Sequence, residues 1–329
     1  MSTSIVSVIV PVYNLEAYIS ECLDSVLGQD YAGVEVVVVN DGSRDGSAEV
    51  VRRYASRYKN LVYLETENQG LSSARNTGLG TASGDYVLFV DGDDYLERDA
   101  ISKCVEAATR NHADVVLFSS APFLDGTREQ LNSPGARRDE RMVGEVMPAE
   151  AFLLRSLRLG NYMPSVCLYM FDRRLVEGIR FLPGILHEDN LFTARLLLEN
   201  ASARVIGIRD ALFNRRVREN SITTMKTTRA HAESFFEVAE HLSQMGDTVA
   251  VQGRKALFWL VQFSIKEALV AAQKIESAVS LADRARALRA LSGIPVRYWK
   301  ARFLPFIVAP DLLFVRSMMS AWKAMRGAR

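Results

Sequence analysis

Cysteine is scarce in this chain of 329 residues, and the three that occur are Cys22, Cys104 and Cys167. They lie far apart, with no CxxC pair and no histidine at the spacing of a metal site. Neither a disulfide framework nor a zinc site is therefore expected. Reduced cysteines favour a cytoplasmic location.

An excess of one charge is also missing. Lys and Arg number 40, Asp and Glu number 39, and the formal net charge is +1. Such a balance produces no overall field that would attract nucleic acid, so no nucleic-acid partner is expected. Any basic surface must be local.

The N-terminal stretch MSTSIVSVIVPVYN lacks a basic region before its apolar run, and that run is only as long as a strand. A signal peptide is therefore not expected. Hydrophobic side chains nevertheless make up 48% of the chain, which is enough to bury a full core. The length fits one large domain with an appendage, or two domains.

The first 120 residues alternate between short β-branched runs and segments with helical spacing. Runs such as VEVVVVN do not alternate apolar with polar residues, which is typical of parallel strands covered on both faces. The pattern predicts a doubly wound, mostly parallel α/β sheet. The predicted strands are 7–11, 34–40, 61–66, 86–90 and 114–119, and the predicted helices are 15–27, 46–57, 72–79 and 98–111.

Polar residues follow three of these strands, in the segments 11–14, 40–43 and 91–94. In a doubly wound sheet, ligands bind beyond the carboxyl ends of the strands, so these segments are expected at one edge. The first turn lacks the GxGxxG pattern, which argues against a dinucleotide of the usual Rossmann type. A different phosphate-bearing ligand is expected.

The segment YVLFVDGDD ends a predicted buried strand with Asp91, Asp93 and Asp94. Three like charges repel at close range, but a divalent cation would neutralise them, and hard oxygen ligands suit Mg²⁺ or Mn²⁺. Because Mg²⁺ usually takes one or two protein carboxylates, phosphates of a ligand would complete its coordination. The alternative is a solvated turn in which an aspartate caps the next helix.

Four segments together resemble the family 2 glycosyltransferases of GT-A fold, in the order VSVIVPVYN, VVVNDGSRDGS, ENQGLSSARNTGLGTASGDYVLFVDGDD and HEDNLF. The resemblance covers roughly residues 5–225 and is strongest to bacterial enzymes that build capsule, exopolysaccharide or lipopolysaccharide. It implies an inverting transfer of a sugar from a nucleotide-sugar, usually a UDP-sugar, with Mn²⁺ or Mg²⁺ as cofactor. The implied acceptor is a glycan or a lipid-linked glycan.

The resemblance also implies roles for individual residues. It places Pro11 and Tyr13 at the nucleotide, with Tyr13 against the base and Asp41 accepting from the pyrimidine. The other residues with implied roles are Arg75, which would contact the nucleotide, Asp91, which would contact the ribose, and Asp93, which would bind the metal. Structural alternatives stay open: Tyr13 as a packing aromatic, Asp41 in an Asx turn, and Arg75 as a cation on the helix surface.

Transfer also requires a base that takes the proton of the acceptor hydroxyl. The segment LPGILHEDNLF places Glu188 and Asp189 at the start of a predicted helix. By resemblance Asp189 is the base, and Glu188 orients it or contacts the acceptor. The alternative is that acids simply favour the first turn of a helix. His187 is expected to be a structural residue or an exposed polar one.

Downstream, ALFNRRVRENSITT concentrates Arg215, Arg216 and Arg218. By resemblance this segment covers the diphosphate, where a guanidinium can stabilise the departing charge. Strand alternation puts Arg216 and Arg218 on one face and points Arg215 away. The same charges would also suit a strand edge that discourages self-association.

After residue 225 the pattern becomes helical, with predicted helices at 228–245, 249–272 and 275–291. The expected division is a GT-A catalytic domain in 1–225 and a helical region in 226–329. Residues 296–329 are basic and apolar, and Pro305, Pro310 and Asp311 break any membrane span. Two interpretations of this tail are left open: an in-plane helix on the inner face of the membrane, or a helix docked on protein.

Two other classes of protein compete with the glycosyltransferase hypothesis. A sugar-1-phosphate nucleotidyltransferase shares a related sheet, but it would carry a Gly-rich loop with arginine and a lysine near the N-terminus. PVYNLEAY has neither. A catalytically silent partner in a polysaccharide assembly complex is the second alternative, and the intact Asp91, Asp93 and Asp189 argue against it.

Overall fold

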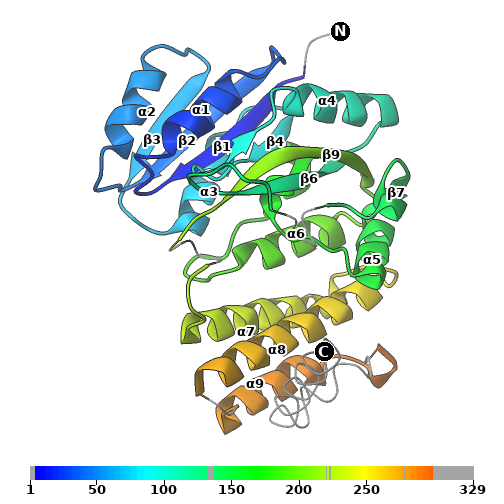
Figure 1. Ribbon diagram of the computed structural model, residues 1–329. Helices are drawn as coiled ribbons and strands as arrows, with labels where there is room; N and C mark the ends of the chain where they lie inside the picture. Colours follow the sequence, from blue (N-terminus) through cyan, green and yellow to red (C-terminus); the bar gives the residue numbers. More distant parts are fainter. Residues whose placement is uncertain (1–3, 132–136, 220, 222–223, 277–278, 299–329) are drawn as a thin grey trace, which may run out of the picture. The chain divides into compact units, whose positions relative to one another are not determined.

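The computed structural model describes residues 4–131, 137–219, 221, 224–276 and 279–298 (Figure 1). The chain divides into two compact units. The first comprises Met1–Gly184 and Phe192–Thr224, and the second comprises Ile185–Leu191 and Met225–Arg329.

The first unit begins with four parallel strands in the spatial order β3-β2-β1-β4. Each of the seven residues of β1 is buried, as expected for a strand covered on both faces. The connecting helices complete a βαβ pattern. The bounds are β1 Val6–Val12, α1 Ile19–Leu27, β2 Val34–Asp41, α2 Ser47–Ala55, β3 Leu61–Thr66, α3 Leu71–Thr81 and β4 Tyr86–Phe89.

Close packing of α3 against this sheet depends on Gly78. A Cβ atom at this position would lie 2.3 Å from Cγ2 of Ile9 on β1, closer than any real contact allows. The absence of a side chain therefore lets α3 lie directly on the sheet. The carboxyl ends of β1, β2 and β4 then meet at one edge of the sheet, because these strands are parallel neighbours.

The rest of the sheet is mixed. Strand β8 (Tyr169–Asp172) runs antiparallel between β4 and β6 (Val115–Leu124), while β6 pairs parallel with the long β9 (Arg204–Val217). Strand β9 also pairs with the short β5 (Tyr95–Leu96) and β7 (Val146–Pro148). Helices α4 (Ala100–Asn111), α5 (Ala149–Leu159) and α6 (Glu188–Glu199) follow these strands in the chain.

The second unit is helical. Helices α7 (Arg229–Gln244), α8 (Arg254–Glu276) and α9 (Leu281–Ser292) pack together (Figure 1). Arg286 on α9 forms ion pairs with Glu233, Glu237 and Glu240 along α7. These glutamates lie on one face of α7 because they are three or four residues apart.

The predicted fold class is confirmed. Strands 34–40 and 61–66 match β2 and β3 to within one residue, whereas the helix predicted from residue 15 begins at Ile19. The unit boundary differs from a cut at residue 225, because residues 185–191 group with the helical unit. The domain division at 225 itself stays a prediction.

The tail expected at 296–329 falls almost entirely outside the described residues, apart from a short 3-10 turn at Val296–Tyr298. Its contact with a membrane therefore stays a prediction. Among the residues that are described, no helix is both long and apolar enough to cross a bilayer.

Candidate active site

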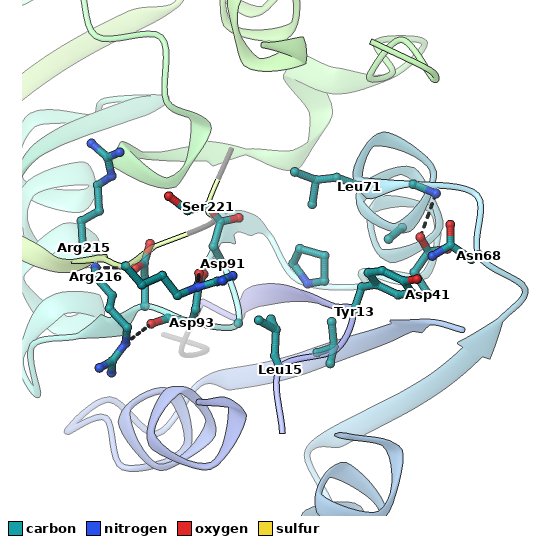
Figure 2. Close-up of a pocket in the computed structure, with 17 residues that line it drawn as sticks. Tyr13, Leu15, Asp41, Asn68, Leu71, Asp91, Asp93, Arg215, Arg216 and Ser221 are labelled. Atoms are coloured by element: carbon teal, nitrogen blue, oxygen red, sulfur yellow. Dashed lines mark hydrogen bonds and ion pairs between the residues drawn. The ribbon is translucent and has the colours of Figure 1, made fainter. Parts of the chain in front are cut away.

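A pocket of about 440 Å³ lies at the carboxyl ends of β1, β2 and β4 in the first unit (Figure 2). Figure 2 shows Tyr13, Asp41 and Asn68 on one side of it, and Asp91, Asp93 and Arg216 on the other. Its lining residues are Pro11, Val12, Tyr13, Leu15, Asp41, Asn68, Gly70, Leu71, Ala74, Asp91, Gly92, Asp93, Asp94, Arg215, Arg216, Arg218 and Ser221.

Asp41, the last residue of β2, forms one wall of the pocket. Its carboxylate is only 3% exposed and accepts hydrogen bonds from the backbone N–H groups of Gln69 (2.9 Å) and Gly70 (2.8 Å). The Asx turn that NDGS suggested belongs instead to Asn40, whose Oδ1 accepts from the Ser43 N–H at 3.1 Å. Asp41 therefore fixes the loop before α3, and its role at a pyrimidine stays a prediction.

Tyr13 is 43% exposed and lines the pocket, which does not fit a purely packing aromatic. The next residue, Asn14, has a φ of 52° and donates its backbone N–H to the Ser43 hydroxyl at 3.0 Å. The Asn14 side chain accepts from the N–H of Arg44 at 2.8 Å. These bonds tie the end of β1 to the end of β2 and hold the loop that presents Tyr13.

The DGDD turn approaches β1 so closely that Gly92 has no room for a side chain. A Cβ atom there would lie 2.8 Å from Cδ1 of Leu15 and 3.1 Å from the carbonyl oxygen of Pro11. Gly92 therefore allows a close contact with β1 and the Leu15 side chain, beyond allowing a bend. This contact sets the position of the aspartates on either side.

Arg75 lies beside the pocket, and its role at the nucleotide stays a prediction. Its side chain is 2% exposed and does not line the pocket. Its Nη2 donates to Oδ1 of Asp91 at 2.8 Å, and its guanidinium lies 5.3 Å from the centre of the Phe181 ring. The interpretation as a surface cation is wrong, since the residue is buried. Arg75 supports the pocket by orienting Asp91 from behind.

Asp93 and Asp94 form the acidic floor of the site. Burial raises the pKa of Asp93, and the negative charge of Asp91 raises it further, although the hydrogen bond and charge of Arg218 lower it. Burial and the charges of Asp93 and Asp91 raise the pKa of Asp94 well above its ordinary value. Both shifts arise because crowded, desolvated carboxylates disfavour the charged form.

Arginines from the end of β9 offset this charge. Arg218 Nε donates to Oδ2 of Asp93 at 2.8 Å. Arg216 donates its backbone N–H to Asp94 at 2.6 Å and its Nε to the carbonyl oxygen of Asp93 at 2.8 Å. Arg215 also lines the pocket, although it was not predicted as a site residue.

Two further acids, Glu21 and Asp125, were not predicted as part of this site. The guanidinium of Arg216 bonds Glu21 and contacts Asp125 at 2.8 Å, and it lies 4.8 Å from the centre of the Phe123 ring. No sequence motif marks these acids, because they come from α1 and from just after β6. They hold Arg216 in place, with its side chain only 8% exposed.

Glu188 and Asp189 open α6 and belong to the second unit. Glu188 is 6% exposed and Asp189 is half-buried. Asn190 donates its backbone N–H to the carbonyl oxygen of His187 at 3.0 Å, which closes the turn at the start of the helix. The predicted catalytic roles of both acids stay predictions.

The pocket offers hard oxygen donors that suit a divalent cation, because Asp91, Asp93 and Asp94 all line it. Among the described residues, no group of three His, Cys, Asp or Glu side chains is arranged to hold a metal by itself. A Mg²⁺ ion usually takes only one or two carboxylates from a protein and its other ligands from phosphates.

Comparison with solved structures defines the class of fold. A crystal structure of S. aureus TarS residues 1–349 in complex with UDP-GlcNAc aligns over 97% of this chain and 92% of that one, with a TM-score of 0.74 and 24% identity. The mannosyltransferase PcManGT from Pyrobaculum calidifontis, in complex with GDP-Man and Mn²⁺, aligns with a TM-score of 0.52. The first unit has the GT-A fold of these glycosyltransferase structures.

The sequence comparison gives the family. Residues 7–179 match the family described as Glycosyl transferase family 2, so the chain belongs to glycosyltransferase family 2.

Individual relatives agree with this assignment. The chain is 46% identical over 227 residues to the uncharacterized glycosyltransferase EpsJ of Bacillus subtilis, covering 67% of this chain and 63% of that protein. It is 34% identical over 245 residues to glycosyltransferase GlyA of Streptococcus pneumoniae serotype 4, covering 73% of this chain and 35% of GlyA. The chain thus spans less than two thirds of the length of these relatives.

Proposed function

We propose that this protein transfers a sugar from a UDP-sugar to a glycan or lipid-linked acceptor during synthesis of a surface polysaccharide. The observation that carries the proposal is the pocket itself. It combines Asp41, Asp91 and Asp93 with Arg216 and Arg218 at the carboxyl edge of a family 2 sheet. Carboxylates can hold a nucleotide and a cation there, while arginines can hold a diphosphate.

The nucleotide would lie along the pocket from Tyr13 to Asp93. Tyr13 offers an exposed aromatic face for the base, and Asp41 is the neighbouring carboxylate. Asp91, held by Arg75, is suited to accept hydrogen bonds from the ribose hydroxyls. The UDP and UDP-GlcNAc complexes of TarS, which has the same fold, support a uridine nucleotide as the ligand.

The diphosphate end would lie at Asp93 and the arginines. Asp93 would hold a Mn²⁺ or Mg²⁺ ion there, and the ion would supply positive charge that stabilises the leaving diphosphate. Asp93 is the carboxylate proposed to hold the ion, and the Mn²⁺ complex of PcManGT supports metal use. Arg216 and Arg218 supply further positive charge at the same place.

Asp189 is the proposed base, and the transfer is proposed to invert the anomeric centre. The acceptor oxygen forms its bond to the anomeric carbon as the bond to the diphosphate oxygen breaks on the opposite face. Asp189 takes the hydroxyl proton in the same step. Glu188 is proposed to orient Asp189 or to contact the acceptor.

Names of further relatives support surface polysaccharide synthesis as the setting. These include the minor teichoic acid biosynthesis protein GgaB of Bacillus subtilis, 26% identical over 234 residues. A poly(ribitol-phosphate) beta-glucosyltransferase of Bacillus spizizenii is 40% identical over 119 residues. The names of these relatives support an acceptor that is a growing glycan or polyol-phosphate chain.

The test is a panel of UDP-glucose, UDP-galactose, UDP-N-acetylhexosamines and UDP-glucuronate, each with Mn²⁺ or Mg²⁺, followed by UDP release. Asp93→Asn is expected to abolish metal-dependent UDP binding and UDP release. Asp189→Asn is expected to stop turnover yet retain UDP affinity. The proposal is wrong if no uridine nucleotide binds, or if Asp93→Asn binds UDP as tightly as the unmodified chain with and without chelator.

A further inference from the structure

The short segment Ile185–Leu191, which carries Glu188 and Asp189, groups with the helical unit. Its backbone is attached to α7 through Ser234. The N–H of Leu186 donates to the Ser234 hydroxyl at 2.8 Å, and that hydroxyl donates to the carbonyl oxygen of Ala230 at 2.7 Å. Ser234 is 3% exposed, so this bond is shielded from water.

The next residue, His187, is attached to α7 through its ring. It stacks on Phe235, with ring centres 4.5 Å apart and planes 20° apart, and it lies 5.4 Å from the ring of His231. Burial and the neighbouring His231 lower the pKa of His187, so the ring is neutral at pH 7. The stack is therefore an apolar contact between two rings.

His187 also has a backbone conformation that few residues adopt. Its φ is 60°, in the left-handed region, and it is not glycine. Such conformations persist where the surrounding structure holds them, and they often occur at functional sites. Here the holding contacts come from two adjacent residues of α7, and the strained residue immediately precedes Glu188 and Asp189.

We propose that Ser234 and Phe235, on α7, are positioning residues for Asp189. The proposal rests on the proposed role of Asp189 as base. The two contacts fix the backbone of residues 186 and 187, and the direction of the first turn of α6 follows from them. A displacement of about 1 Å at a reacting group can cost about a hundredfold in rate.

A packing role alone would give a different result. If these contacts only stabilised the helical unit, their loss would lower the melting temperature and leave the turnover of the folded protein unchanged. If they position Asp189, their loss lowers kcat while UDP affinity is retained, because UDP is proposed to bind in the pocket of the first unit.

The experiment compares Ser234→Ala with Ser243→Ala in the full chain. Ser243 is the matched control, since it lies on the same helix and bonds the carbonyl oxygen of Glu240 at 2.8 Å. Phe235→Leu is compared with Phe235→Tyr, which keeps the ring for His187. Each variant is measured for UDP release from the active donor of the panel, UDP affinity, and amide hydrogen exchange in residues 186–191.

Ser234→Ala and Phe235→Leu are expected to lower kcat about tenfold or more and to speed exchange in 186–191, with UDP affinity unchanged. Ser243→Ala and Phe235→Tyr are expected to match the unmodified chain in kcat and in the rate of exchange in 186–191. The positioning role is overturned if exchange in 186–191 does not change, or if it changes with no loss in kcat.

Asp189→Asn, measured in parallel, separates this inference from the proposed function. If Asp189→Asn keeps full turnover, the assignment of the base is wrong. If it is inactive while Ser234→Ala and Phe235→Leu behave like Ser243→Ala, the base is right and the positioning role is wrong.

Discussion

At the scale of single residues, the pocket contains three neighbouring aspartates whose negative charges are offset by arginines. Asp91, Asp93 and Asp94 would repel one another strongly in a desolvated turn. Arg75 contacts the first from behind, Arg218 contacts the second, and Arg216 donates its backbone N–H to the third. Each carboxylate thus has an arginine partner, and two of these arginines come from more than 100 residues further along the chain.

Arg75→Lys tests the support given to Asp91. Lysine keeps the charge but loses the planar fork and the contact with the Phe181 ring. Loss of one charge-assisted hydrogen bond costs about 1.5–3 kcal/mol. We therefore expect UDP affinity, measured by calorimetry with Mn²⁺, to fall about tenfold or more.

The matched control is Arg174→Lys, since Arg174 forms a similar pair with Asp172 but is 80% exposed and does not line the pocket. This variant is expected to bind UDP like the unmodified chain. Equal affinities for Arg75→Lys and Arg174→Lys would show that Asp91 does not depend on Arg75.

Gly92→Ala tests the close approach of the DGDD turn to β1. The added methyl would lie 2.8 Å from Cδ1 of Leu15 and 3.1 Å from the Pro11 carbonyl oxygen, so either the turn or the Leu15 side chain must shift. We expect unfolding free energy to fall by roughly 1–3 kcal/mol, because overpacking costs about this much, and UDP affinity to fall with it.

Gly80→Ala is the control for that variant. Gly80 lies in α3, a Cβ atom added there would meet no other atom within 4 Å, and its φ is not positive. Alanine favours the helix over glycine by about 1 kcal/mol, so this variant should be neutral or stabilised. A Gly92→Ala protein as stable as Gly80→Ala would contradict the packing argument.

At the scale of helices and strands, the sequence predicts the core better than the site. Strands such as β2 are predictable because its central residues, Val36–Val39, form a continuous apolar run that is buried on both faces. The start of α1 is missed because residues 15–18 have helical spacing but form turns. Short β5 has only two residues, too few for any period to be recognised.

Contacts between distant residues explain why the site was only partly predictable. The DGDD motif and the resemblance to family 2 identified Asp91, Asp93 and Arg218 as separate candidates. Their pairing could not be predicted, because Arg218 and Asp93 are 125 residues apart and alternation gives direction only within a strand. The burial of Arg75 was missed for the same reason, since Phe181 comes from a segment over 100 residues away.

Asp283→Asn tests the attachment of α9 to α7. Asp283 is fully buried and accepts from both terminal nitrogens of Arg229, while Ser280 also donates to it. Burial alone would raise the pKa of Asp283, but the hydrogen bonds from Arg229 and Ser280 lower it below its ordinary value. At pH 7 the variant should lose about 2 kcal/mol of unfolding free energy, measured by urea denaturation.

The sign of the pH dependence follows from that lowered pKa. A carboxylate with a lowered folded pKa contributes stability above its unfolded pKa of about 4, and this contribution is lost as the pH falls through the folded value. The difference in unfolding free energy between Asp283→Asn and the unmodified chain should therefore be largest at pH 7 and should decrease below pH 4. Exposed Asp247→Asn is the control, and a difference that grows on acidification would contradict the ion-pair argument.

At the scale of the whole molecule, binding of UDP should raise the free energy of unfolding. UDP is proposed to bind the folded pocket and not the unfolded chain, so it shifts the equilibrium towards the native state. At a concentration one hundred times its Kd, the gain is about 2.7 kcal/mol. We expect the melting temperature to rise with UDP concentration when Mn²⁺ is present, measured by thermal unfolding.

The nucleotide and the metal can be separated in this experiment. With chelator, or in Asp93→Asn, the shift should shrink, because the cation proposed at Asp93 no longer offsets the repulsion between carboxylates and diphosphate. ADP should give a smaller shift than UDP, since Tyr13 and Asp41 are proposed to read a pyrimidine. Equal shifts for ADP and UDP would remove the base-reading role of these two residues, whereas equal shifts with and without chelator would remove the metal.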